Sequence, residues 1–365
     1  MPASKSLTFH CCCLSALFMS SPSSLVPPSP RAGPPGSTDC LARRALGVDP
    51  LGHFASADVA PRFRLNKSAV NQLINWIQPY LSVTSKRNHG ISTLHQILLA
   101  LRFYALGTML VSVADFIGVS IASASRIVSD VSKAIARLYS NFVVLQNHTQ
   151  QEFYNIARFP RVHGVIDGTH ILIQSPNSNV GEEFRNRKGT FSINVQVVCN
   201  CKLVFLNVVA RWPGSTHDAT IFNHSDLKDY CEQGRLGNRW LLGDSGYPCT
   251  PYLLTPLLNP NTPSEQSYNE AHIKTRNTIE RCIGVWKRRF PILSLKMRLK
   301  LENMQSVIIA TAVLHNIART MNLDEIEPEI SIPETTQEEN VIVNDNSPIS
   351  NMSERQLLIN NYFNV

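Results

Sequence analysis

The chain has 365 residues, 43% of them hydrophobic, so it is long enough to bury the core of one large domain with a smaller one beside it. Its net charge of +7 is unevenly distributed. From Leu323 onward there are nine acidic residues and a single basic one, Arg355, so this segment has a charge of −8 and residues 1–322 have a charge of +15. So basic a region favours a polyanionic partner such as DNA, although a basic surface that serves only solubility gives the same count. The nine cysteines, an odd number without any Cys-x-x-Cys pair, exclude a fully paired disulfide scaffold and favour a reducing, intracellular compartment.

Residues 1–60 are expected to form a disordered leader, because a run rich in Pro, Ser and Gly covers Ser21 to Gly36. The apolar stretch Cys11 to Met19 has some features of a signal peptide. A secreted enzyme released after Ser20 therefore stays as an alternative, but it would need a disulfide pattern, which the odd cysteine count disfavours. No membrane span is expected, since charged residues interrupt the apolar run Leu94 to Ile121.

Residues 61–150 are predicted to form a helical region, because apolar residues recur there at helical spacing. In its most informative part a short helix ends at Gly118, and Ser120 is placed to cap the next helix. That helix would carry Ser123 in its first turn and three cations away from its buried stripe. The stripe is predicted to contain Ile121, Ala124, Ile127, Val128, Val131, Ile135 and Leu138. The cations are Arg126, Lys133 and Arg137.

This arrangement is typical of a helix-turn-helix, in which the second helix meets base edges while basic residues meet phosphates. A helix pair with a purely structural role gives the same pattern and remains the alternative. The sequence therefore predicts a helical, DNA-contacting region without deciding between the two.

Residues 160–321 are expected to form a mixed α/β domain that begins with three strands, Val162–Ile173, Ile193–Asn200 and Lys202–Ala210. Asp167 lies in the middle of the first strand, where a carboxylate is costly unless a metal ion, hydrogen bonds or a counter-charge compensates it. The loop before the second strand carries Arg187 and Lys188, which suit contacts with DNA phosphates; a solvated loop is the alternative.

Three later acids are placed so that they could approach Asp167. Asp218 follows the third strand, Asp244 ends the short strand Trp240–Gly243, and Glu280 lies on a long helix. Hard divalent cations bind such oxygen ligands, and two metal ions can share carboxylates while they hold the attacking and leaving oxygens of a phosphodiester. Taken singly, Asp218 or Asp244 is a common turn residue, so only the four acids together favour a metal site.

The long helix begins at Thr262, with Glu265 three residues later to complete a capping box. Glu280 borders its inner stripe and can point toward the sheet, although a solvated Glu280 paired with Arg276 one turn earlier is the alternative. Much of the remaining helix surface is cationic, as a DNA-facing helix would be, and the DNA contacts predicted there are Arg281, Lys287, Arg288 and Arg289. After a last helix, residues 322–365 are expected to form an acidic disordered tail.

Five motifs, in this order, resemble those of the Harbinger-type DDE transposases and of the nucleases derived from them in animals. The resemblance extends from about Arg62 to about Thr320, and the motifs are Asp167-Gly168-Thr169-His170, Asn186-Arg187-Lys188-Gly189, Trp212 to Asp218, Gly243 to Pro248 and Ile279 to Phe290. It implies a ribonuclease H-like mixed sheet with flanking helices, preceded by the helix-turn-helix-like region. It also implies a divalent-metal site, with Mg²⁺ or Mn²⁺, at Asp167, Asp218, Asp244 and Glu280.

The same resemblance implies a nuclease that hydrolyses DNA phosphodiester bonds, with Asp167, Asp244 and Glu280 as the catalytic acids. Nucleus and cytoplasm are the expected locations. A separately encoded Myb/SANT-like DNA-binding protein is an expected partner, which argues against autonomous transposition, and a homo-oligomer is a further expectation. The alternative is a catalytically silent DNA-binding or adaptor protein that keeps the transposase fold.

Overall fold

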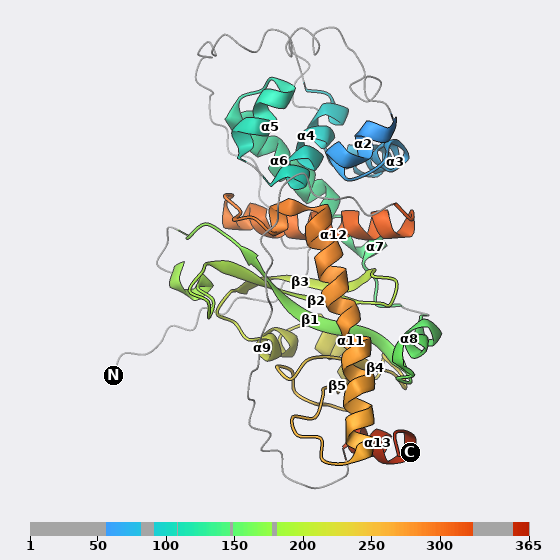
Figure 1. The fold of residues 1–365 in the computed structure, drawn as a ribbon. Coiled ribbons are helices and arrows are strands. Elements are labelled where there is room, and N and C mark those ends of the chain that lie inside the picture. The colour runs from blue at the N-terminus through green and yellow to red at the C-terminus, as the bar shows by residue number, and fades with distance from the viewer. Residues whose placement is uncertain are drawn as a thin grey trace, which may run out of the picture. The chain divides into compact units, whose positions relative to one another are not determined.

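The computed structural model describes residues 56–81, 91–107, 109–146, 149–176, 181–323 and 353–364, all within one compact unit (Figure 1). Of the predicted leader, only residues 56–60 belong to this set, and they open helix α2, Ser56–Phe63. Residues 1–55 lie outside the described part of the chain.

A five-stranded mixed sheet forms the centre of the fold, in the order β3-β2-β1-β4-β5. Strands β1 (Val162–Leu172), β2 (Ser192–Cys199) and β3 (Phe205–Pro213) are antiparallel neighbours, whereas β4 (Trp240–Leu242) and β5 (Leu253–Leu254) run parallel to β1. The prediction of a mixed α/β fold is confirmed. Because β1 is the central strand, its side chains are buried from both faces of the sheet.

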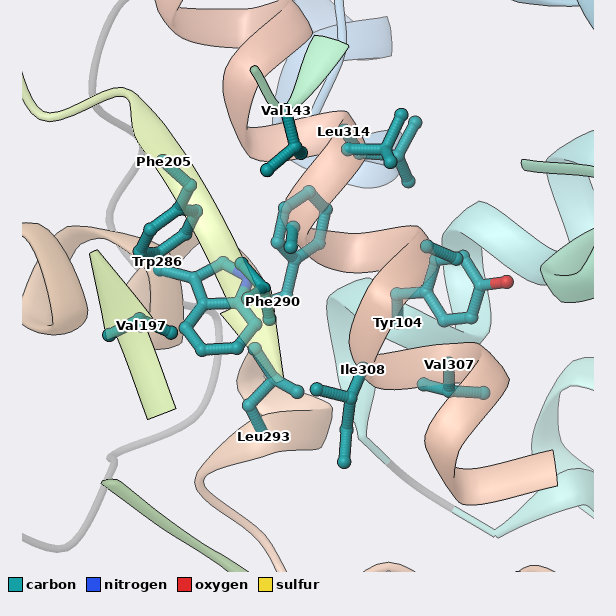
Figure 2. Close-up of a cluster of buried hydrophobic side chains, with 14 of the residues drawn as sticks. Tyr104, Val143, Val197, Phe205, Trp286, Phe290, Leu293, Val307, Ile308 and Leu314 are labelled. Carbon is teal, nitrogen blue, oxygen red and sulfur yellow. The ribbon is translucent and has the colours of Figure 1, made fainter. Parts of the chain in front are cut away.

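Different helices cover the two faces. Val197, Phe205 and their neighbours pack against α11 (Pro263–Arg289) and α12 (Leu301–Thr320). Figure 2 shows Phe205 beside Trp286 of α11 and Phe290, the residue that follows this helix; the ring centroids of Phe205 and Trp286 lie 5.0 Å apart. On the other face, Ile166 packs with Phe222 of α9 (Asp218–Asn223) and Leu227 of α10 (Asp226–Glu232). Alternation along β1 thus sends neighbouring side chains into two separate clusters.

The N-terminal helices share the larger of these clusters. Helices α3 (Lys67–Ile77), α4 (Thr93–Leu106), α5 (Leu110–Ile117) and α6 (Ile121–Ala136) contribute buried apolar side chains, and α6 packs against α12. Polar contacts strengthen this packing: the hydroxyls of Tyr104 and Ser132 lie 2.6 Å apart, and Ser129 Oγ donates to Asn303 Oδ1 at 2.8 Å. The helical region and the sheet therefore share one core.

Two short helices connect this region to β1, α7 (Tyr139–Phe142) and α8 (Gln150–Ala157). Within the described ranges no helix alone has the length and apolar content to cross a membrane. The pair α5 and α6 meets that test only when the two are taken together, by length and composition alone, and they are bent by 97° at their junction.

The C-terminal segment differs from the prediction. Residues 324–352 of the predicted disordered tail lie outside the described part of the chain, but Glu354–Tyr362 forms helix α13. Its Leu358 and Ile359 are buried together with Phe363, whose ring centroid lies 5.6 Å from those of Phe159 and Tyr268. The prediction is wrong for this helix because the acidic composition of the tail concealed a small apolar set that packs beside α11.

Candidate active site

Asp167 lies in the interior of the sheet. It sits on the central strand opposite Val197 and is only 7% exposed. Burial raises the pKa of Asp167 to about 8, the guanidinium of Arg276 opposes this shift, and the nearby carboxylates of Asp244 and Asp218 add to it. Asp167, Asp218 and Asp244 therefore lie close enough together for the charges of the other two to affect the ionisation of Asp167, which is poorly solvated.

Asp218 reaches this point from the face of the sheet that α9 covers. It is the first residue of α9, and Asn194 Nδ2 on β2 donates both to its Oδ1 and to the carbonyl of Thr216, each at 2.9 Å. The carboxylate lies directly over Gly168: a Cβ added at that glycine would be 2.7 Å from Asp218 Cγ. Only a glycine beside Asp167 leaves room for this second acid.

Asp244 comes two residues after β4, and because β4 runs parallel beside β1, the end of this strand brings the acid next to Asp167. Gly246 N donates to Asp244 Oδ1 at 3.0 Å, a side-chain turn that fixes the carboxylate. Tyr247, three residues after Asp244, is 3% exposed. The pKa of its phenol is raised by burial and then by the charges of Asp218, Asp167 and Asp244.

Glu280 joins the group indirectly. Its side chain is 47% exposed and accepts from Arg276 Nη2 at 2.6 Å, the i−4 pairing that the sequence offered as the alternative. Arg276 Nη1 also donates to Asp167 Oδ2, at 3.2 Å. The structure thus links Asp167 on β1 to Glu280 on α11 through one guanidinium.

The donor set fits a hard divalent cation in its chemistry, since all four side chains offer carboxylate oxygens and the burial of Asp167 beside two other acids favours added positive charge. In the described part of the chain, however, His, Cys, Asp and Glu side chains form no group of three or more that could hold a metal ion as they stand. Arg276 lies between Asp167 and Glu280 instead.

Sequences of known families and proteins match both the region of these acids and most of the chain. Residues 166–316 match a family model described as "DDE superfamily endonuclease". The "Putative nuclease HARBI1" of Rattus norvegicus is 34% identical over 302 residues, which cover 78% of this chain and 86% of that protein. The chain belongs to this family of Harbinger transposase-derived nucleases.

The resemblance found in the sequence motifs is thereby confirmed. The Homo sapiens relative of the same name is 33% identical over 301 residues, 78% of this chain and 86% of the relative, and "Protein ALP1-like" of Arabidopsis thaliana is 25% identical over 255 residues, 64% and 62% of the two chains. No solved structure shows a significant match to the chain.

In this member of the nuclease family, a cationic loop lies near Asp218. Arg187 and Lys188 are exposed, and Arg187 Nη2 donates to His217 Nδ1 at 2.5 Å, next to Asp218 in sequence. The pKa of His170 is lowered to about 4, chiefly by burial and then by the charges of Lys287, Lys188 and Arg187. The two loop cations predicted to contact DNA therefore gather beside the acids.

The four predicted DNA contacts on α11 divide into three groups. Arg281 and Arg288 are exposed. Lys287 is half-buried, donates to the carbonyl of His170 at 3.2 Å, and has its pKa lowered to about 8 by burial. Arg289 is only 2% exposed and donates to the carbonyl of Arg64 at 3.0 Å, so its prediction as a DNA contact is wrong.

The reason for the error at Arg289 is helical phase. Cys282 and Trp286, seven and three residues earlier on the same helix, are fully buried, so a residue at this position faces the core as well. The charge of Arg289 suggested the surface, whereas its position in the helix placed it inside.

The predicted helix-turn-helix residues lie on α6 and at its two ends. Helices α5 and α6 meet at 97°, Gly118 adopts a left-handed conformation (φ 71°), and Ser120 Oγ accepts from Ser123 N at 3.1 Å. Arg126, Lys133 and Arg137 are exposed, with the Arg137 guanidinium 5.2 Å from the centroid of the Tyr80 ring. Ile121, predicted to be buried, is 53% exposed at the first turn.

Sequence reasoning missed two polar residues near the acids, Asn194 and Tyr247, and the contact between Arg276 and Asp167. The sequence of β2 contains a signal for Asn194: Ser192, Asn194 and Gln196 alternate with Ile, Val and Val in a strand that is buried throughout. Three polar side chains on one face of such a strand indicate that this face borders a polar site.

Gly168→Ala is expected to push the Asp218 carboxylate away from Asp167 and to destabilise the protein by about 1–3 kcal/mol, because the added methyl overlaps that carboxylate. Chemical denaturation measures the effect. Gly284→Ala on α11 is the matched control: a Cβ there meets nothing within 4 Å, so the change should stabilise the protein by roughly 0.5–1 kcal/mol. Equal effects of the two substitutions would contradict the crowding of Asp218 against Gly168.

Proposed function

We propose that the protein is a divalent-metal-dependent nuclease that hydrolyses DNA phosphodiester bonds. The observation that carries this proposal is the convergence of Asp218 and Asp244 on the buried Asp167, in a chain whose relatives include proteins named as nucleases. Such a cluster of acids at the centre of a sheet is costly for stability, and a bound metal ion would offset that cost.

We also propose that the sheet is ribonuclease H-like. Its three antiparallel strands are followed by two that run parallel to the first, and the helix with Glu280 packs on β1. This topology supports the proposal because β4, which precedes Asp244, and α11, which carries Glu280, both neighbour β1, the strand of Asp167.

In the proposed site, Asp167, Asp244 and Glu280 would hold Mg²⁺ or Mn²⁺, with Asp218 as a further ligand. The bound metal would supply activation of a water molecule and charge stabilisation at the departing oxygen. The chain itself supplies orientation: Asn194 fixes the Asp218 carboxylate, Gly246 N fixes that of Asp244, and Gly168 leaves the space between the acids open. Arg187 and Lys188 would bind phosphates on either side of the cut.

DNA would also contact α6. The right-angled junction with α5, the capped first turn and the exposed Arg126, Lys133 and Arg137 support a helix-turn-helix role for this pair. A Myb/SANT-like protein that supplies additional DNA binding, and the absence of autonomous transposition, belong to the same proposal.

One observation favours a second candidate function, a catalytically silent DNA-binding protein. Arg276 holds Asp167 and Glu280 by its own contacts, so the acids have a counter-charge without any metal. In that case the carboxylates would persist because they hold β1 and α11 together, and the basic helices would carry the function.

Cleavage of labelled duplex DNA with Mg²⁺ or Mn²⁺ separates the two candidates. Asp244→Asn and Glu280→Gln are expected to lower the cleavage rate at least about 100-fold, because each removes a charged ligand without changing the size of the side chain. Glu270→Gln is the matched control, since its side chain is 73% exposed on the same helix as Glu280 and should leave the rate unchanged. Tight DNA binding by the wild type without any metal-dependent cleavage would favour the silent protein.

Arg126→Ala is expected to weaken DNA binding and to reduce the slope of log affinity against log salt concentration by about 0.9, the contribution of one phosphate contact. Fluorescence anisotropy at several salt concentrations measures both. Lys228→Ala on α10, which removes a cation paired with Glu232 at 3.5 Å, is the control and should leave the slope unchanged. An unchanged slope for Arg126→Ala would remove α6 from the DNA-binding surface.

A further inference from the structure

Arg276 bridges two of the proposed metal ligands from different elements of the fold. Its Nη1 lies 3.2 Å from Asp167 Oδ2 on β1, and its Nη2 lies 2.6 Å from Glu280 Oε1 on α11. The Arg276 side chain is 19% exposed and that of Asp167 10%, so this half of the bridge is shielded from water. The guanidinium occupies the space between the two carboxylates.

The geometry of α11 fixes this position. Thr275 and Ile279 are fully buried and hold the helix against the sheet, so Arg276 lies at the border of the buried stripe, one helical turn before Glu280. A guanidinium presents its donors in a rigid planar fork and can address two carboxylates at once. A lysine ammonium is a single charged centre on a flexible chain.

Electrostatics gives the bridge a purpose. Without a metal ion, the acids on β1, at the end of β4 and on α9 repel one another in a poorly solvated site. Lys287, the other partly buried cation on the same helix, contacts the carbonyl of His170. The cation in contact with both Asp167 and Glu280 is Arg276.

We propose that Arg276 is a placeholder cation that holds Asp167 and Glu280 in position in the metal-free protein and releases both carboxylates when a divalent cation binds. This inference rests on the carboxylate metal site proposed above. It assigns Arg276 a positioning role: the site stays assembled without metal, and metal binding must first break the two contacts of the guanidinium. The apparent affinity for metal is lowered accordingly.

Isothermal titration of the full chain with Mn²⁺, together with thermal unfolding with and without Mn²⁺, tests the proposal. Arg276→Gln should unfold at a lower temperature than wild type without metal, yet bind Mn²⁺ about five- to tenfold more tightly and gain more in unfolding temperature from it. Arg276→Lys keeps the charge but cannot form the fork, so it should also bind Mn²⁺ more tightly than wild type. If Arg276→Gln does not fold without metal, Arg276→Lys alone tests the proposal.

Lys274→Gln is the matched control, because it removes one positive charge two residues away on the same helix, from a side chain that is 66% exposed and paired with Glu270. It should bind Mn²⁺ as wild type does. Equal Mn²⁺ affinity in wild type and both Arg276 variants would overturn the placeholder role and leave the metal site intact. Tighter binding in Arg276→Gln but not in Arg276→Lys would show a general charge effect and overturn the bridge, whereas no Mn²⁺ binding by any variant would overturn the metal site as well.

Discussion

A carboxylate in the middle of the central strand is the constraint on which the rest of this structure depends. Asp167 is paired with its neighbours by the backbone of β1, so it cannot move to the surface, and its burial must be compensated where it lies. The Gly168 amide and the Arg276 guanidinium both donate to it, at 2.9 and 3.2 Å. Strand β4 and helices α9 and α11 each bring a further charged group close to Asp167.

The two faces of β1 contribute differently. Arg276 and Glu280 approach from α11, whereas Asp218 approaches from α9 over a glycine that has no side chain to exclude it. Alternation along a strand would normally keep residues on opposite faces apart. Because Gly168 has no side chain, Asp218 can come close to Asp167 from the opposite face of the sheet. Acids from both faces can therefore gather around Asp167.

Much of this arrangement could be predicted from the sequence. Apolar runs gave β1 to β4 within a few residues, and Thr262 with Glu265 located the start of α11, where the structure contains the full capping box. Five ordered motifs identified the family. What the sequence could not provide was tertiary distance: the spacing of Arg276 and Glu280 predicts their contact within the helix, but nothing local predicts that the same guanidinium also reaches Asp167.

The errors have different physical origins. Arg289 was assigned by its charge, whereas helical phase places it in the core. Ile121 was assigned by helical phase, yet it is the first residue of α6 and is 53% exposed there. Helix α13 was missed because acidic composition outweighed three apolar residues that find a partner only in the folded protein. Local pattern therefore fixed the elements, while side-chain environment depended on contacts between distant parts of the chain.

The central claim is that these acids form a metal site, and anomalous scattering from crystals grown with Mn²⁺ tests it most directly. The claim predicts a manganese peak in contact with the carboxylates of Asp167 and Asp244, with the Arg276 guanidinium moved away from Asp167. Manganese absent from this position, or bound elsewhere while Arg276 still bridges Asp167 and Glu280, would contradict it.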